Sequence, residues 1–156
     1  MQGRAALRRT LAVAAMALGM GLAAAAQSNE FMDRLLGAKA ASFGQAAYLV
    51  LAAADKIGAD ADETAAFAAL QSMKLAPKGA TATAPVRLDQ FAYILVRAFG
   101  IKGGIMERLA PSPRYAYREL AYEQVIQGDS DPAMRVSGLL AVQMLGRVMD
   151  ASGAAQ

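Results

Sequence analysis

Residues 45–51 read Gln-Ala-Ala-Tyr-Leu-Val-Leu, and residues 90–96 read Gln-Phe-Ala-Tyr-Ile-Leu-Val. A shift of 45 positions superposes the glutamine, the second alanine and the tyrosine. Both stretches are apolar at helical spacing, which predicts two related helices. A recurrence at this period is typical of proteins built from copies of one structural unit, and it indicates an internal repeat.

A second shift, of 50 positions, extends the similarity to a short and a long apolar stretch together. The matched pairs are Val86 and Val136, Leu95 and Leu145, Arg97 and Arg147, Ala66 and Ala116, Phe67 and Tyr117, and Leu70 and Leu120. We interpret them as three units, at about 30–57, 63–100 and 115–149, each with a short helix, a loop and a longer helix. Chance is the alternative, because helices rich in alanine and leucine align easily.

The chain has few β-branched runs, and its apolar residues recur every three or four positions. This pattern predicts helices over 30–36, 42–57, 62–73, 87–99, 115–125 and 134–149. The expected fold is all-α: a small bundle of pseudo-threefold helix-loop-helix repeats, forming a single domain over residues 27–156. We expect the three long helices to pack together, with the short ones outside.

The first 26 residues resemble a secretory signal. Arginines, including Arg8 and Arg9, precede an uncharged apolar stretch at 11–22, and the alanines at 24–26 suit a signal peptidase. The paired arginines also permit a twin-arginine leader. A retained membrane anchor is the alternative, but the stretch is shorter than the roughly 20 residues that cross a bilayer. We expect cleavage before Gln27, no membrane span in the mature chain, and export to the periplasm or cell envelope.

Composition excludes several functions. The net charge of +3 comes from the three leader arginines, so the remaining 13 basic residues face 13 acidic ones and predict no nucleic-acid partner. The absence of histidine and cysteine excludes their nucleophilic pairs, the common zinc sites and a lipid-modified cysteine. The acidic cluster at 60–63 suits helix capping better than a calcium loop. We therefore expect no metal and no cofactor.

Short motifs in the repeats resemble the surface-layer homology family, whose units place a Thr-Arg-Ala-Glu sequence near the start of the longer helix. Residues 86–89 (Val-Arg-Leu-Asp) keep the arginine and an acid, and residues 134–137 (Met-Arg-Val-Ser) keep the arginine. Residues 125–128 (Val-Ile-Gln-Gly) are similar to the family's Gly-Ile-Ile-x-Gly turn, and residues 75–79 are a looser version. Ser42 stands at the arginine position of the first unit.

The resemblance spans residues 30 to 150, and it implies a pseudo-threefold helical module that docks without a covalent bond onto peptidoglycan or a wall-linked polysaccharide. It also implies that Arg87 and Arg135 are ligand-binding residues. We predict both in the first turn of their helices, where the macrodipole disfavours a cation. A bound anion held by free helix amides and the guanidinium would explain them. An intramolecular pair between Arg87 and Asp89 is the alternative.

Two further groups are candidate binding residues. Gly79 and Gly128 would let a saccharide approach the backbone, beside the amide of Gln127, although turn glycines usually serve a dihedral angle. The connection at 102–118 is the other candidate surface. Its candidate side chains are Arg108, Arg114, Tyr115, Tyr117 and Arg118, of which at least one tyrosine is expected to close the core instead.

These observations predict a non-catalytic envelope-binding module whose partner is cell-wall glycan or peptidoglycan. An adaptor that binds another envelope protein through its helical surface is the alternative, since no attached cargo is evident. An enzyme is a third class, because Glu119 and Glu123 would suit a hydrolytic pair. Their spacing of one helical turn beside Arg118 favours a solvated face, so no catalytic residue is expected.

Overall fold

The computed structural model describes residues 29–58, 60–101, 111–128 and 130–153, and the chain divides into two units after Arg34. Residues 29–37 are helical, and in the first unit Arg34 Nη1 lies 2.9 Å from Glu30 Oε1. The predicted leader lies outside the described residues. The second unit begins at Leu35 and contains the remaining helices.

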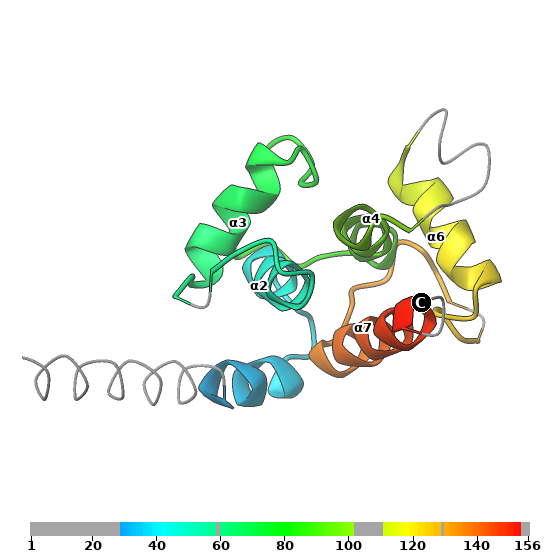
Figure 1. Ribbon diagram of the computed structural model, residues 1–156, viewed down its shortest axis with the longest axis horizontal. Coiled ribbons are helices and arrows are strands. Elements are labelled where there is room, and N and C mark those ends of the chain that lie inside the picture. The colour runs from blue at the N-terminus through cyan, green and yellow to red at the C-terminus, as the bar shows by residue number, and fades with distance from the viewer. Residues whose placement is uncertain (1–28, 59, 102–110, 129, 154–156) are drawn as a thin grey trace, which may run out of the picture. The chain divides into compact units, whose positions relative to one another are not determined.

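The described part of the second unit is helical, and its only extended pairing is two isolated antiparallel bridges. The all-α prediction is therefore confirmed. The labelled helices are α2 (Phe43–Ala53), α3 (Glu63–Ser72), α4 (Leu88–Phe99), α6 (Pro113–Tyr122) and α7 (Gly138–Gly153) (Figure 1). No helix in these ranges is long and apolar enough to span a bilayer.

The helix starts follow from capping side chains. The N–H groups of Gln45, Ala65 and Tyr115 donate to the side-chain oxygens of the N-caps Ser42, Asp62 and Ser112. Several predicted boundaries were wrong. Helix α6 covers Pro113–Tyr122 and not residues 115–125, and α7 ends at Gly153 and not at residue 149. Helix α2 ends at Ala53, before a positive φ at residue 55, and not at residue 57. Helix α7 begins at Gly138 and not at residue 134, because the backbone of Met134 and Val136 bonds distant segments and Arg135 forms a bridge with Arg87.

The three long helices α2, α4 and α7 contact one another, as the repeat predicted. Each short helix, however, packs on the long helix that precedes it, so that α3 lies beside α2 and α6 lies beside α4 (Figure 1). Buried side chains include Phe91, Leu95 and Met144, none of which has exposed surface. Burial of such side chains stabilises each helix by roughly 1.5–3 kcal/mol per residue.

Three buried backbone positions close a ring of hydrogen bonds. The N–H of Ala41 donates to the carbonyl of Val136 (2.7 Å), that of Val136 to Val86 (3.1 Å), and that of Val86 to Ala41 (2.9 Å). All three residues have no exposed surface. Each lies shortly before α2, α4 or α7, so the ring joins the entrances of the three long helices.

A second set of bonds surrounds this ring. The N–H groups of Phe43, Leu88 and Gly138, each the first residue of a long helix, donate to the carbonyls of Ala84, Met134 and Ala38 at 2.9, 2.9 and 3.0 Å. The antiparallel bridges Ser42–Pro85 and Arg87–Arg135 lie between the two sets. At the third entrance, the start of α7, the backbone of Leu35 lies close to Gly138. A Cβ added to Gly138 would stand 1.6 Å from the carbonyl oxygen of Leu35.

Helices α3 and α6 end in the same way, each on a residue with a left-handed backbone. Lys74 has φ 59° and Gln124 has φ 60°, and the N–H of the next residue donates to Leu70 or Leu120. A residue with a side chain costs about 1 kcal/mol relative to glycine in the left-handed region of backbone conformation.

We expect Lys74→Gly and Gln124→Gly each to raise the free energy of unfolding by about 0.5–1 kcal/mol, measured by urea titration. Lys78→Gly, at a loop position without positive φ, should give no gain.

Candidate functional site

The start of α4 holds the first candidate, Arg87. It is the N-cap residue, with extended backbone (φ −87°, ψ 161°), and so lies just outside the first turn where we predicted it. Its N–H donates to Gln90 Oε1 at 3.0 Å, and the N–H groups of Leu88 and Asp89 donate to Met134 and Pro132 at 2.9 and 3.0 Å. The helix amides that the anion hypothesis required to be free are therefore occupied.

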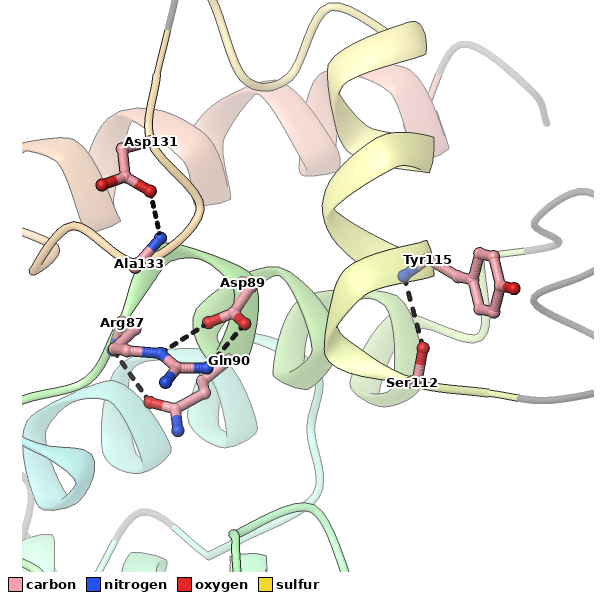
Figure 2. Close-up of polar contacts among 7 residues, drawn as sticks. All are labelled: Arg87, Asp89, Gln90, Ser112, Tyr115, Asp131 and Ala133. Atoms are coloured by element: carbon pink, nitrogen blue, oxygen red, sulfur yellow. Dashed lines mark hydrogen bonds and ion pairs between the residues drawn. The ribbon is translucent and has the colours of Figure 1, made fainter.

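The guanidinium of Arg87 makes the intramolecular pair that was the alternative interpretation. Its Nε and Nη2 donate to the two carboxylate oxygens of Asp89 at 3.0 and 2.7 Å (Figure 2). These hydrogen bonds, and then the charge of Asp89, raise the pKa of Arg87 above its ordinary value. The Asp89 side chain is 14 % exposed, which is little for a carboxylate, so the pair keeps this charge compensated at the helix start.

Arg135 lies three residues before α7, outside the helix, so the prediction that it occupies the first turn was wrong. It faces Arg87 across an antiparallel bridge. The flanking bonds, from Leu88 to Met134 and from Val136 to Val86, make this a non-hydrogen-bonded pair, in which neighbouring side chains leave the same side of the two segments. By position in the bridges, Arg135 corresponds to Pro85, and Arg87 corresponds to Ser42.

An open pocket of about 440 Å³ lies beside this pair, between the start of α4 and the exposed side of α6. Its lining residues are Asp89, Arg114, Tyr117, Arg118 and Pro132. Helix α6 supplies three of them at a spacing of three and four residues, which places them on one face. The Tyr117 hydroxyl donates to the carbonyl of Ser130, and this bond fixes the ring against the loop that contains Pro132.

The two arginines of α6 give the pocket its charge. Arg114 and Arg118 are both exposed, and neither makes an ion pair with another described residue. They are one turn apart, where like charges destabilise a helix, and Arg114 also stands in the first turn, where the macrodipole disfavours it. The electrostatic argument that we applied to Arg87 and Arg135 thus applies to Arg114.

The remaining candidates do not line the pocket. Tyr115 projects from the opposite side of α6 from Arg87 and Asp89 (Figure 2), and its N–H bonds the cap at Ser112. Gly79 and Gly128 are exposed turn residues with φ of 77° and 79°, so their conformation accounts for glycine. Gln127 is exposed beside Gly128. Arg108 lies outside the described residues.

Asp89 and Pro132 are pocket residues that we did not predict. Asp89 appeared only as a partner for Arg87, and Pro132 only as part of a turn. The spacing of Arg114, Tyr117 and Arg118 was the available signal for the face of α6, but nothing local in the sequence shows that residues 130–134 fold back over α4.

The junction of α2 and α3 has a similar backbone hydrogen bond and different side chains. The N–H of Gly44 donates to Ala82 at 2.8 Å, as Asp89 does to Pro132. A Cβ on Gly44 would meet the carbonyl oxygens of Ala82 and Glu63 at 3.2 and 3.3 Å, so this junction is tightly closed. In α3, Thr64 and Ala68 stand where α6 has Arg114 and Arg118. The α4–α6 junction therefore has two arginines that the α2–α3 junction lacks.

Comparisons with protein-family models, curated proteins and solved structures give no match to this chain. Within the described ranges, no three acidic side chains gather in a way that would hold a metal ion.

Proposed function

We propose that this chain is a non-catalytic binding module of the cell envelope, which docks onto peptidoglycan or a wall-linked polysaccharide through the pocket between α4 and α6. The observation that carries the proposal is the pair Arg114 and Arg118, which line an open pocket without an ion-pair partner in the described part of the chain. A guanidinium binds a carboxylate through two parallel hydrogen bonds. Carboxylates occur on wall sugars and peptide stems.

The other lining groups suit a sugar ring. The Tyr117 ring is held in place by its bond to Ser130, and with Pro132 it offers a rigid apolar surface for a pyranose face. The Asp89 oxygens each accept one bond from Arg87 and keep lone pairs for a hydroxyl. The pocket volume of about 440 Å³ is in the range of small-ligand sites.

We further propose that the bundle arose from three copies of one unit. The closed ring through Ala41, Val86 and Val136 supports it, because equivalent positions in a threefold arrangement are expected to bond in a cycle. Gln45 and Gln90, identical in the repeat, both accept the N–H of the N-cap residue at 3.0 Å. The chain's place in the envelope rests on the proposed leader.

Co-sedimentation with purified peptidoglycan tests the binding function. We expect the protein to pellet with the wall material, and Arg114→Ala or Arg118→Ala to weaken binding by about tenfold or more, the value of a charge-assisted hydrogen bond. Higher salt should weaken binding further. Arg97→Ala is the matched control, since it removes an exposed arginine from α4 outside the pocket lining and should bind as the parent does.

Two results would contradict the proposal: a parent protein that stays in the supernatant, or arginine variants that pellet as well as the parent. Circular dichroism of each variant separates loss of binding from loss of folding. Arg135→Ala is measured in the same series. Arg135 lies opposite Arg87 and near the loop that contains Pro132, but it does not line the pocket.

A further inference from the structure

Helix α7 is apolar on two sides, and only one side is used by the bundle. Ala141, Met144, Leu145 and Val148 are buried in the core. On the remaining surface Leu139 is 54 % exposed and Met149 is 48 % exposed, with Val142 half-buried and Gly146 exposed between them. The spacing of three, four and three residues aligns these four positions in one stripe, which we call the outer stripe. Among its 16 residues α7 has only two charged side chains, Arg147 and Asp150.

Gly146 has no function within the described fold. It lies in mid-helix, and a Cβ there would meet nothing within 4 Å. A helical glycine costs about 1 kcal/mol relative to alanine. A small residue in the middle of an exposed apolar stripe allows the backbone of another helix to approach closely.

The charges at the two ends of α7 indicate that the approaching helix is a second copy of α7. Asp150 lies in the last turn, where the macrodipole of its own helix disfavours an acid. Arg135 lies three residues before the first turn, and no described acidic side chain pairs with it. In an antiparallel pair of α7 helices, each Asp150 would lie over the positive start of the partner helix, near Arg135. The ends of α7 are thus complementary to a second copy of α7.

We propose that the outer stripe is a self-association surface, and that two copies of this chain pair through antiparallel α7 helices. With the centre of the pair between Val142 and Gly146, Leu139 of one copy packs against Met149 of the other, and Val142 packs against Gly146. This arrangement is isologous, so the same surface serves both partners and the assembly closes as a dimer. The proposal does not depend on the wall-binding function, because no residue of the stripe lines the pocket.

Cysteine cross-linking tests the pairing and its direction. The chain has no cysteine, so a single introduced thiol reports one position. We expect an equimolar mixture of Leu139→Cys and Met149→Cys chains to form a mixed disulfide on mild oxidation. Leu139→Cys alone should cross-link poorly, because ten residues at 1.5 Å each separate the two thiols by about 15 Å along the axis, beyond the roughly 7 Å limit between Cα atoms.

Analytical ultracentrifugation gives the affinity. The parent protein should dimerise as its concentration rises, and Leu139→Asp should raise the dimer Kd by about tenfold or more. Tyr122→Asp is the matched control, since this tyrosine is 81 % exposed on α6 and should leave the Kd unchanged. Asp150→Arg should also raise the Kd, and Arg135→Asp in the same chain should restore it.

A parent protein that is monomeric at every concentration overturns the proposal, as does Leu139→Cys self-cross-linking that equals the mixed reaction. Flotation of a monomeric protein with phosphatidylethanolamine–phosphatidylglycerol vesicles, lost in Leu139→Asp, would assign the stripe to a lipid surface and would likewise overturn it.

Discussion

Replacing Gly138 with alanine is expected to lower the free energy of unfolding by about 3–5 kcal/mol, a large part of the stability of a small domain. The new methyl group would lie 1.6 Å from the carbonyl oxygen of Leu35 and 2.5 Å from its carbon. Both are backbone atoms, so no side-chain rotation relieves the overlap. The two segments must separate, and the 3.0 Å bond from Gly138 to Ala38 is then lost. Urea unfolding followed by circular dichroism measures the change.

Gly146→Ala is the control for this prediction, because it makes the same chemical change in the same helix. With open space around its Cβ, Gly146 should gain about 0.5–1 kcal/mol from the higher helix propensity of alanine. The comparison is made at low protein concentration, where association does not contribute. Equal effects of the two substitutions would show that the contact between Gly138 and Leu35 does not form.

Val136→Pro is expected to cost about 3–5 kcal/mol as well, through loss of a buried hydrogen bond at the entrances of the long helices. Proline has no N–H, so the carbonyl of Val86 would lose its 3.1 Å partner. Val86 has no exposed surface, and a buried carbonyl without a partner costs about 1–3 kcal/mol before any strain is counted. The same urea titration, with proteolysis as a second readout of local opening, measures the loss.

Arg135→Pro, one residue earlier, should change the stability by less than about 1 kcal/mol. Arg135 holds a non-hydrogen-bonded position of its bridge, and its N–H makes no backbone bond to another described residue. The corresponding position in the other bridge is already a proline, Pro85. A large loss of stability from Val136→Pro beside a small change from Arg135→Pro would show that the ring of bonds also forms in solution. If Arg135→Pro unfolds the protein and Val136→Pro does not, the register of the bridge is wrong.

The sequence predicted the helices well where local signals are strong. Asp62, in the cluster expected to cap a helix, is the N-cap of α3, and α4 ends at Phe99 before Gly100 as expected. The prediction from sequence failed over residues 134–137, which we placed in a helix. Their apolar pattern suits a helix, but the carbonyl of Met134 and both backbone groups of Val136 bond residues 46, 50 and 95 positions away in the chain. Such long-range pairing leaves no periodic trace in the local sequence.

The candidate site was predictable only in part, for the same reason. Arg87 and Asp89 are two positions apart, so an ion pair between them was a natural alternative from the sequence. The structure shows this pair. Arg114 was predicted and lines the pocket. Pro132 could not be assigned to the site, because its carbonyl reaches Asp89 across 43 positions of the chain. The family motif also aligned Arg135 with Arg87, whereas the bridges align Arg135 with Pro85.

The closed ring has a consequence for the order in which this protein folds. The N–H of Ala41 requires the carbonyl of Val136, which the ribosome adds 95 residues later. The bundle therefore cannot be complete before the chain has been synthesised through Val136, and long-range closure of this kind is slow. During translation the nascent chain keeps unsatisfied backbone groups and uncovered apolar surface, a state that a chaperone can hold and a translocation pore can thread.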